Sequence, residues 1–157
     1  MATKKKSRKI ANPKLGKAVV LNRVRTALDR FDAEDAYLLN EDVSERTMCA
    51  SLSCHLRKSF PGWHVDVEYN RDGTISKFAG GGGKTKKTLV VPDIIVHRRG
   101  TGPNLLVIEA KGGPATVVDP HDQKKLLAYR KNQGYRFALF LAFRAQGSSE
   151  RFLKWFD

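Results

Sequence analysis

Residues 89–111 read LVVPDIIVHRRGTGPNLLVIEAK, two apolar runs of strand length joined by a turn that is rich in glycine. Short runs of Val, Ile and Leu are typical of buried β-strands. Each run contains one carboxylate, Asp93 in the first and Glu109 in the second. Burying a carboxylate among Val and Ile is costly unless a cation compensates its charge, so both positions are candidate site residues.

The turn at 99–103 predicts an antiparallel hairpin centred on Thr101, in which residues i and 202 − i face each other. This register places Asp93 opposite Glu109, with their Cβ atoms about 4.5–5.5 Å apart on one face of the sheet. Because side chains alternate along a strand, Lys111 shares that face. Two opposed carboxylates favour a hard divalent cation between them, and a lysine beside such an ion suits phosphodiester hydrolysis.

The rest of the chain predicts helices and strands around this hairpin. Val20, Val24, Ala27, Leu28 and Phe31 recur at helical spacing in a first helix, 17–39. A second helix, 43–60, has Asp42 as its expected N-cap and Glu45 as the partner in a capping box. The other expected elements are strands at 63–69, 89–97, 105–111 and 135–143, a helix at about 119–132 and a terminal helix at 148–156. This order predicts an α/β fold with a mixed sheet flanked by helices.

Pro92-Asp93 followed by Glu109-Ala110-Lys111 resembles the PD-(D/E)XK nuclease superfamily, which includes restriction endonucleases and Holliday-junction resolvases. The resemblance covers about two-thirds of the chain and implies a restriction endonuclease-like αβββαβ core, here with an extra N-terminal helix. It implies that Asp93, Glu109 and the backbone carbonyl of Ala110 are ligands of Mg²⁺, for which Mn²⁺ would substitute, and that Lys111 is the catalytic lysine.

Three further residues, Glu45, Glu68 and His97, each have two interpretations. Many members of the superfamily add a glutamate from the helix before the strands, and Glu45 fits that role as well as it fits a capping box. Glu68 either lines the site or points outward, and His97 either contacts phosphate or is a solvated residue at a strand end. After the Glu-Xaa-Lys strand, several branches place polar residues on the next helix, where Gln123 and Lys125 are candidates.

The charge distribution indicates a polyanionic partner. The chain carries 29 Lys and Arg against 16 Asp and Glu, a net charge of +13, and residues 46–157 alone hold nineteen basic and nine acidic side chains. Nucleic acid is the commonest polyanion, so we expect DNA, double-stranded or branched, as the partner. The expected phosphate contacts are Lys84, Lys86, Lys87, Arg98 and Arg99. Residues 1–16 form a basic tail, expected to be either a disordered arm or a DNA grip, and 17–157 a single domain.

Several classes of protein are excluded. No apolar run exceeds eight residues, which argues against a membrane span. Cys49, Cys54 and His55 lack zinc-site spacing and are interpreted as helix packing. Gly80–Thr85 lacks the first glycine of a phosphate-binding loop, so no nucleotide cofactor is expected.

The leading hypothesis is a metal-dependent endonuclease of the cytoplasm and nucleoid, or of the nucleus in a eukaryote, working as a homodimer or with a partner. The alternative is a non-catalytic nucleic-acid-binding module on the same fold. A third class, a basic RNA-associated protein, leaves Asp93 and Glu109 unexplained.

Overall fold

The structure is a computed structural model that describes residues 14–41, 43–69, 71–72, 75–76, 91–100, 102–144 and 150–156. Its helices are α1 (Lys17–Asn40), α2 (Glu45–Ser59) and α3 (Pro120–Gln133). Its strands are β1 (His64–Val67), β2 (Arg71–Asp72), β3 (Ile75–Ser76), β4 (Ile94–His97), β5 (Asn104–Pro114), β6 (Phe137–Arg144) and β7 (Phe152–Phe156). None of the helices in these ranges is long and apolar enough to cross a bilayer.

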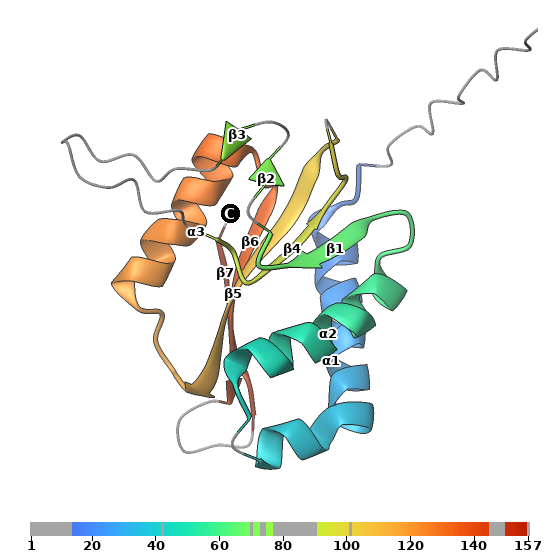
Figure 1. The fold of residues 1–157 in the computed structure, drawn as a ribbon, viewed down its shortest axis with the longest axis vertical. Helices are drawn as coiled ribbons and strands as arrows, with labels where there is room; N and C mark the ends of the chain where they lie inside the picture. The colour runs from blue at the N-terminus through green and yellow to red at the C-terminus, as the bar shows by residue number, and fades with distance from the viewer. Residues whose placement is uncertain are drawn as a thin grey trace, which may run out of the picture.

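A five-stranded sheet in the order β1-β4-β5-β6-β7 forms the centre of the fold (Figure 1). Only β5 and β6 are parallel; the other neighbours are antiparallel, so the sheet is mixed, as predicted. The β5–β6 pair is parallel because α3 connects the two strands and returns the chain to the same end of the sheet.

The sheet separates two hydrophobic cores. Helices α1 and α2 cover one face, where Phe31 and Leu52 pack with Ile108. Helix α3 covers the other face, where Leu126 packs in a cluster with Phe140. The protein is therefore an α/β sandwich of three layers, as the sequence predicted.

Helix α1 confirms the predicted apolar face, since all five expected core residues are buried. The predicted start of α2 is wrong. Its N-cap is Ser44, whose hydroxyl accepts a hydrogen bond from the Thr47 backbone N–H, while Asp42 lies outside the described residues. Glu45 is thus the first residue of the helix, and its carboxylate accepts a hydrogen bond from the backbone N–H of Gly112.

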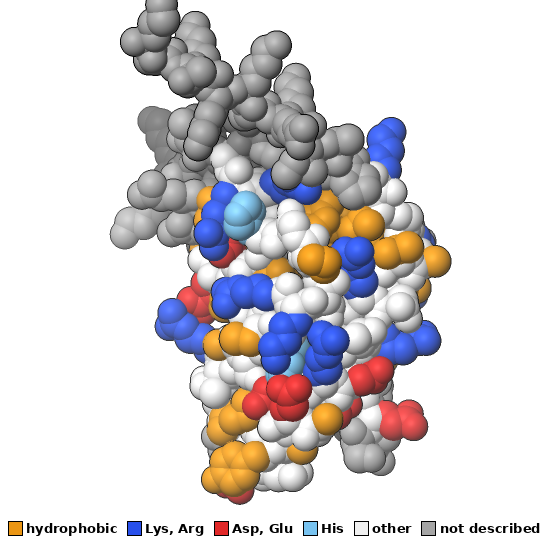
Figure 2. All heavy atoms as spheres, turned by 90° about the vertical axis from the view of Figure 1, so that its right-hand side faces the viewer, with side chains coloured by type: hydrophobic (Ala, Val, Ile, Leu, Met, Phe, Trp, Pro, Cys, Tyr) orange, Lys and Arg blue, Asp and Glu red, His pale blue; other side chains and the backbone are white. Residues whose placement is uncertain are grey.

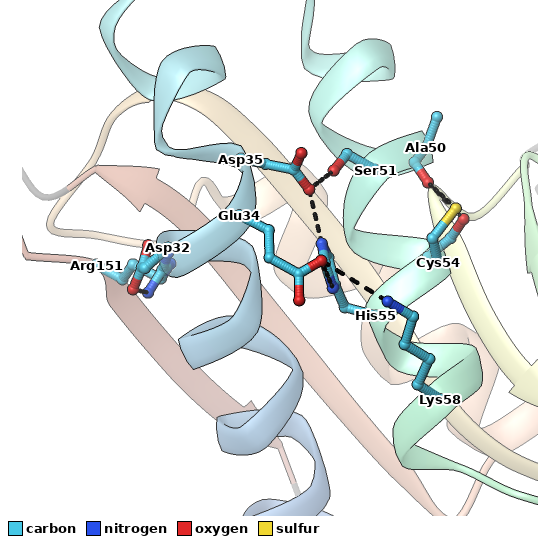
Figure 3. A network of polar contacts seen from close by, with 10 residues as sticks. Asp32, Glu34, Asp35, Ala50, Ser51, Cys54, His55, Lys58 and Arg151 are labelled. Carbon is cyan, nitrogen blue, oxygen red and sulfur yellow. Dashed lines mark hydrogen bonds and ion pairs between the residues drawn. The ribbon is translucent and has the colours of Figure 1, made fainter.

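A polar network joins α1 to α2 (Figure 3). The Asp35 carboxylate accepts a hydrogen bond from the Ser51 hydroxyl and lies 2.6 Å from Nε2 of His55. These two contacts lower the pKa of Asp35. Asp35 also has non-helical backbone angles, which kink α1 at this contact. His55 is therefore buried between the helices as a hydrogen-bonded packing residue, in line with its expected structural role.

The two cysteines differ in their environment. Cys49 is buried in the hydrophobic core, in line with the packing role expected for it, and it also lines a small cavity with Glu45 and Asp93. Cys54 is exposed, and its thiol hydrogen-bonds to the Ala50 carbonyl one turn earlier (Figure 3), so the expectation of packing was wrong there.

The hairpin of β4 and β5 has the predicted register. Ile94 pairs with Ile108 and Ile95 with Val107, so each pair sums to 202. A bulge shifts the register only at the turn end, where His97 pairs with Asn104. Asp93, one residue before β4, is consequently placed opposite Glu109.

The predicted terminal helix is wrong, because residues 152–156 form strand β7 along the edge of β6. Side chains alternate: Phe152 and Phe156 pack on the α3 side, whereas Trp155 packs toward the core of α1 and α2. Aromatic residues with this period of two favour a strand, and β6 offered unpaired backbone groups to complete it.

Candidate active site

The site forms where β4 begins beside the second half of β5. Asp93 precedes β4, and its Oδ2 accepts a hydrogen bond from the Ala110 backbone N–H at 2.7 Å. The register places Glu109 opposite Asp93, close enough for the charge of Asp93 to raise the pKa of Glu109. Since the N–H and C=O groups of one strand residue point to the same side, the Ala110 carbonyl faces the space beside Asp93. Three oxygen donors expected from the sequence thus lie together.

Burial raises the pKa values of both carboxyl groups, Asp93 and Glu109. The Glu109 side chain is only 3% exposed. Burial and then the charge of Asp93 raise the pKa of Glu109 to about 8. Burial likewise raises the pKa of Asp93. Glu109 Oε1 is also buried and has no hydrogen-bond partner within the part of the chain that the structure describes. Both acids are therefore short of positive charge.

Lys125 of α3 supplies part of that charge. Its ammonium donates a hydrogen bond to Glu109 Oε2, and it lies 4.0 Å from Asp122 Oδ1 on the preceding turn of the helix. The Lys125 side chain is 19% exposed, so this ion pair is largely removed from water. The residue expected only to line the site is in direct contact with a proposed metal ligand.

Lys111 lies two residues beyond Glu109 on β5 and faces α3. Its Nζ is 3.3 Å from Asp122 Oδ2. Burial lowers the pKa of Lys111, but the hydrogen bond and charge of Asp122 outweigh this, so the pKa is raised overall. The Lys111 side chain is 45% exposed, which leaves its ammonium accessible from solvent.

Glu45 reaches the site from the start of α2. Its Oε2 accepts a hydrogen bond from the Gly112 backbone N–H at 2.9 Å. Gly112 permits this approach because a Cβ there would lie 2.6 Å from Cε of Met48 and 3.3 Å from Cβ of Glu45. Glu45 and Asp93 both line a small cavity of about 50 Å³. The structure thus brings Glu45 to the predicted acidic pair.

Glu68 lines the same cavity, which favours the first of its two readings. Its carboxylate forms an ion pair of 2.8 Å with Arg46, and its backbone N–H donates to the Asp93 carbonyl. Glu68 has a φ of +48°, an uncommon conformation for a residue with a Cβ. Its tertiary contacts therefore hold the end of β1 against the segment that carries Asp93.

His97 lies at the far end of β4, and neither of the two interpretations given for it from the sequence fits its position. It shares a face with Asp93 but is four residues away, about 13 Å along a strand. Its side chain is buried, with Nε2 2.7 Å from Asp66 Oδ2 and its ring against Tyr69. His97 is thus neither solvated nor beside the carboxylate pair.

The expected phosphate contacts are only partly described. Arg99 forms an ion pair with Asp66, and Arg98 lies over the Trp63 ring, 5.3 Å from its centroid. Gln123 is exposed on α3, and Lys84, Lys86 and Lys87 lie outside the described residues. Figure 2 shows the face to the right of Figure 1, where basic side chains cross the middle and acidic ones lie below. The face in this view therefore carries charges of both signs.

Sequence reasoning missed Gly112, Asp122 and the contact of Lys125 with Glu109. The Gly112-Gly113 pair directly after Lys111 was the available signal, since adjacent glycines on a strand mark a close backbone approach. Asp122 had no signal of its own, because an aspartate in the first turn of a helix is ordinary.

The residues present fit a divalent cation in part. Among the described residues, no set of three or more His, Cys, Asp and Glu side chains is arranged to hold a metal ion. The carboxylates of Asp93 and Glu109 nevertheless lie opposite each other, and Oε1 of Glu109 is buried without a hydrogen-bond partner among the residues that the structure describes. Oxygen donors of this kind suit Mg²⁺ or Mn²⁺. The obstacle is the Lys125 ammonium on Glu109.

Comparison with family models, with curated proteins and with solved structures gives no match for this chain.

Proposed function

We propose that this protein is a metal-dependent endonuclease that hydrolyses phosphodiester bonds of DNA. The observation that carries the proposal is the β4–β5 register, which places Asp93 beside Glu109 with Lys111 on the same face. Glu45 reaches this point from α2. This convergence agrees with the resemblance to PD-(D/E)XK nucleases noted from the sequence.

Each residue has a distinct role in this proposal. Asp93, Glu109 and the Ala110 carbonyl would hold Mg²⁺ or Mn²⁺, with Glu45 as a further acidic group. A bound divalent ion polarises a phosphate and lowers the pKa of an attacking water. Lys111, with its exposed ammonium, binds a phosphate oxygen and neutralises charge that develops on it.

DNA is the proposed substrate because the sequence after residue 45 is strongly basic. Residues 46–157 carry ten more basic than acidic side chains. Contacts to phosphate position a nucleic acid without reading its sequence, so cleavage is proposed to be structure-selective or weakly sequence-selective. Cutting both strands needs two active sites, which a homodimer or a partner would supply.

The test is cleavage of supercoiled plasmid and of a four-way DNA junction, with Mg²⁺, Mn²⁺ or EDTA. Lys111→Ala is compared with wild type and with Lys131→Ala, which removes an exposed lysine from the last turn of α3. Cutting that needs metal, falls at least about 100-fold in Lys111→Ala and persists in Lys131→Ala supports the proposal. Equal cutting by all three proteins would refute the assignment of Lys111.

One observation favours a second candidate, a non-catalytic nucleic-acid-binding module. The Lys125 ammonium already donates a hydrogen bond to Glu109. In a non-catalytic protein such an ammonium would permanently take the place of a metal ion. Binding of both DNAs, without cutting under either metal, would favour this candidate.

A further inference from the structure

We infer that Lys125 is the counter-ion of the metal-free site, and that a divalent cation arriving at Glu109 transfers Lys125 to Asp122 and releases Lys111. This cation exchange rests on the proposed metal site. It assigns positioning roles to Lys125 and Asp122, two residues of α3 that hold the other charged groups of the site.

The first step is competition for Glu109. Its Oε2 accepts a hydrogen bond from Lys125, whereas its Oε1 is buried without a partner among the described residues. A divalent ion bound between Glu109 and Asp93 would meet the ammonium inside a site with little water. Two cations at such close range repel each other strongly where the effective dielectric is low. The ammonium must therefore leave Glu109 when the metal arrives.

The second step is the destination of Lys125. Asp122 Oδ1 is already 4.0 Å from Lys125 Nζ, because the two residues are three apart on α3. A lysine side chain has four rotatable bonds, so a shift of about 1 Å would bring the ammonium to hydrogen-bond distance. The Asp122 side chain is only 7% exposed, and it would then contact a second ammonium besides that of Lys111.

The third step is the release of Lys111. In the structure Lys111 Nζ lies 3.3 Å from Asp122 Oδ2. Asp122 thus lies between two lysines, and neutralising it with Lys125 weakens its hold on Lys111. Because Lys111 is the more exposed of the two lysines, its ammonium is then available for a phosphate oxygen.

The primary test measures binding of Mn²⁺ alone by calorimetry, without DNA and without turnover. Lys125→Met removes the competing cation, so Mn²⁺ should bind about tenfold more tightly than to wild type, the factor that 1.4 kcal/mol produces. Lys131→Met on the same helix is the matched control and should bind as wild type does. If Lys125 only stabilised the fold, Lys125→Met would weaken the binding of Mn²⁺. Tighter binding therefore separates the proposed role from a structural one.

Asp122 is tested by a double-mutant cycle on the same Mn²⁺ affinity. Asp122→Asn removes the acceptor for the displaced ammonium and should weaken Mn²⁺ binding several-fold in wild type. The same change made in Lys125→Met should have a smaller effect, because no ammonium is displaced there. Equal effects in both backgrounds would overturn the transfer of Lys125 to Asp122.

Lys125→Gln is a second variant for the case that Lys125→Met does not fold. Its amide can still donate a hydrogen bond to Glu109 but carries no charge. Urea unfolding with EDTA checks that each variant is folded. If Lys125→Met and Lys125→Gln are both folded and wild type binds Mn²⁺ at least as tightly as they do, the cation exchange is overturned. The proposed metal site would then still stand. Mn²⁺ binding by the variants but not by wild type would make Lys125 a permanent counter-ion and also overturn it. Absence of binding to every folded protein would overturn the proposed metal site itself.

Discussion

Glu109 illustrates how a single buried charge organises its surroundings. The sequence places it on a strand of Val, Ile and Leu, where water cannot stabilise its charge. In the structure the ammonium of Lys125 from α3 contacts one of its oxygens, but Asp93 lies close by and adds a second negative charge. A pKa of about 8 records that this compensation is incomplete. An additional cation would complete it, which supports the proposal that Glu109 is a metal ligand.

Gly112 is the residue whose replacement should disturb the site most directly. In Gly112→Ala the new Cβ would meet Met48 Cε at 2.6 Å and Glu45 Cβ at 3.3 Å, so the end of the Met48 side chain must turn away and Glu45 must shift slightly. We expect a loss of about 1–3 kcal/mol in the free energy of unfolding, measured with urea, and weaker Mn²⁺ binding.

The neighbouring glycine provides the control for this prediction. A Cβ on Gly113 would have no atom within 4 Å, so Gly113→Ala should change stability by less than about 0.5 kcal/mol. Equal losses in the two variants would show that a general strand effect, rather than the contact with Glu45, is responsible.

The lowered pKa of Asp66 should make the free energy of unfolding depend on pH. The hydrogen bond from Arg99, followed by that with His97, lowers the pKa of Asp66 to about 2 from 3.8. A carboxyl whose pKa is lower in the folded protein stabilises it above the unfolded pKa and loses this effect as pH falls through the folded pKa. Asp66→Asn should therefore cost about 1–2 kcal/mol at neutral pH, a figure discounted because Arg99 is half exposed.

Urea unfolding at a series of pH values tests this assignment. The stability difference between wild type and Asp66→Asn should be constant above about pH 5, shrink below about pH 4 and approach zero near pH 2. A difference that does not change over this range would mean that the ion pair with Arg99 is not the source of the effect.

Helix α3 is the element that connects the sheet to the site chemistry. Leu126 and Tyr129 anchor it in the core, and Asp122 and Lys125 lie on the turns that face the end of β5. Asp119 begins the helix by accepting a hydrogen bond from the His121 backbone N–H. The position of the two polar residues therefore depends on where this helix starts and how it packs.

The end of α3 depends on Gly134, which has a φ of +68° at the C-cap. Gly134→Ala places a Cβ in the left-handed region and should lower the free energy of unfolding by about 1 kcal/mol. Gly134→Asn should cost less, because asparagine tolerates this conformation better. Chemical denaturation of the three proteins measures the difference, and an alanine variant as stable as wild type would contradict this interpretation of the cap.

At the scale of the whole molecule, charge should govern how strongly DNA binding depends on salt. Residues 1–13 carry five of the basic side chains, whereas residues 46–157 carry nineteen. Replacing Lys4, Lys5, Lys6, Arg8 and Lys9 by Gln should reduce the slope of log K against log salt by at most about 4–5 and leave binding detectable. Fluorescence anisotropy of a labelled duplex over a range of salt concentrations measures both quantities. Complete loss of binding would instead assign the DNA contact to the first thirteen residues.

The elements of the fold were largely predictable because their signals are local. The spacing of Val20, Val24 and Phe31 predicted α1, and the Asp119-Pro120 pair predicted the start of α3, which the structure confirms. Residues 152–156 were assigned to the wrong element because five residues carry too little periodicity. The unpaired edge of β6, a tertiary feature, decides that they form a strand.

The sequence by itself determined the hairpin, its register and therefore the meeting of Asp93 with Glu109. This was possible because a short turn leaves antiparallel strands with almost no freedom in how they pair. Only the tertiary structure decided which charged side chains lie around those carboxylates. Lys125, Asp122 and Glu45 come from helices whose rotation and distance from the sheet are set by packing on both of its faces, and no spacing along the chain encodes that geometry.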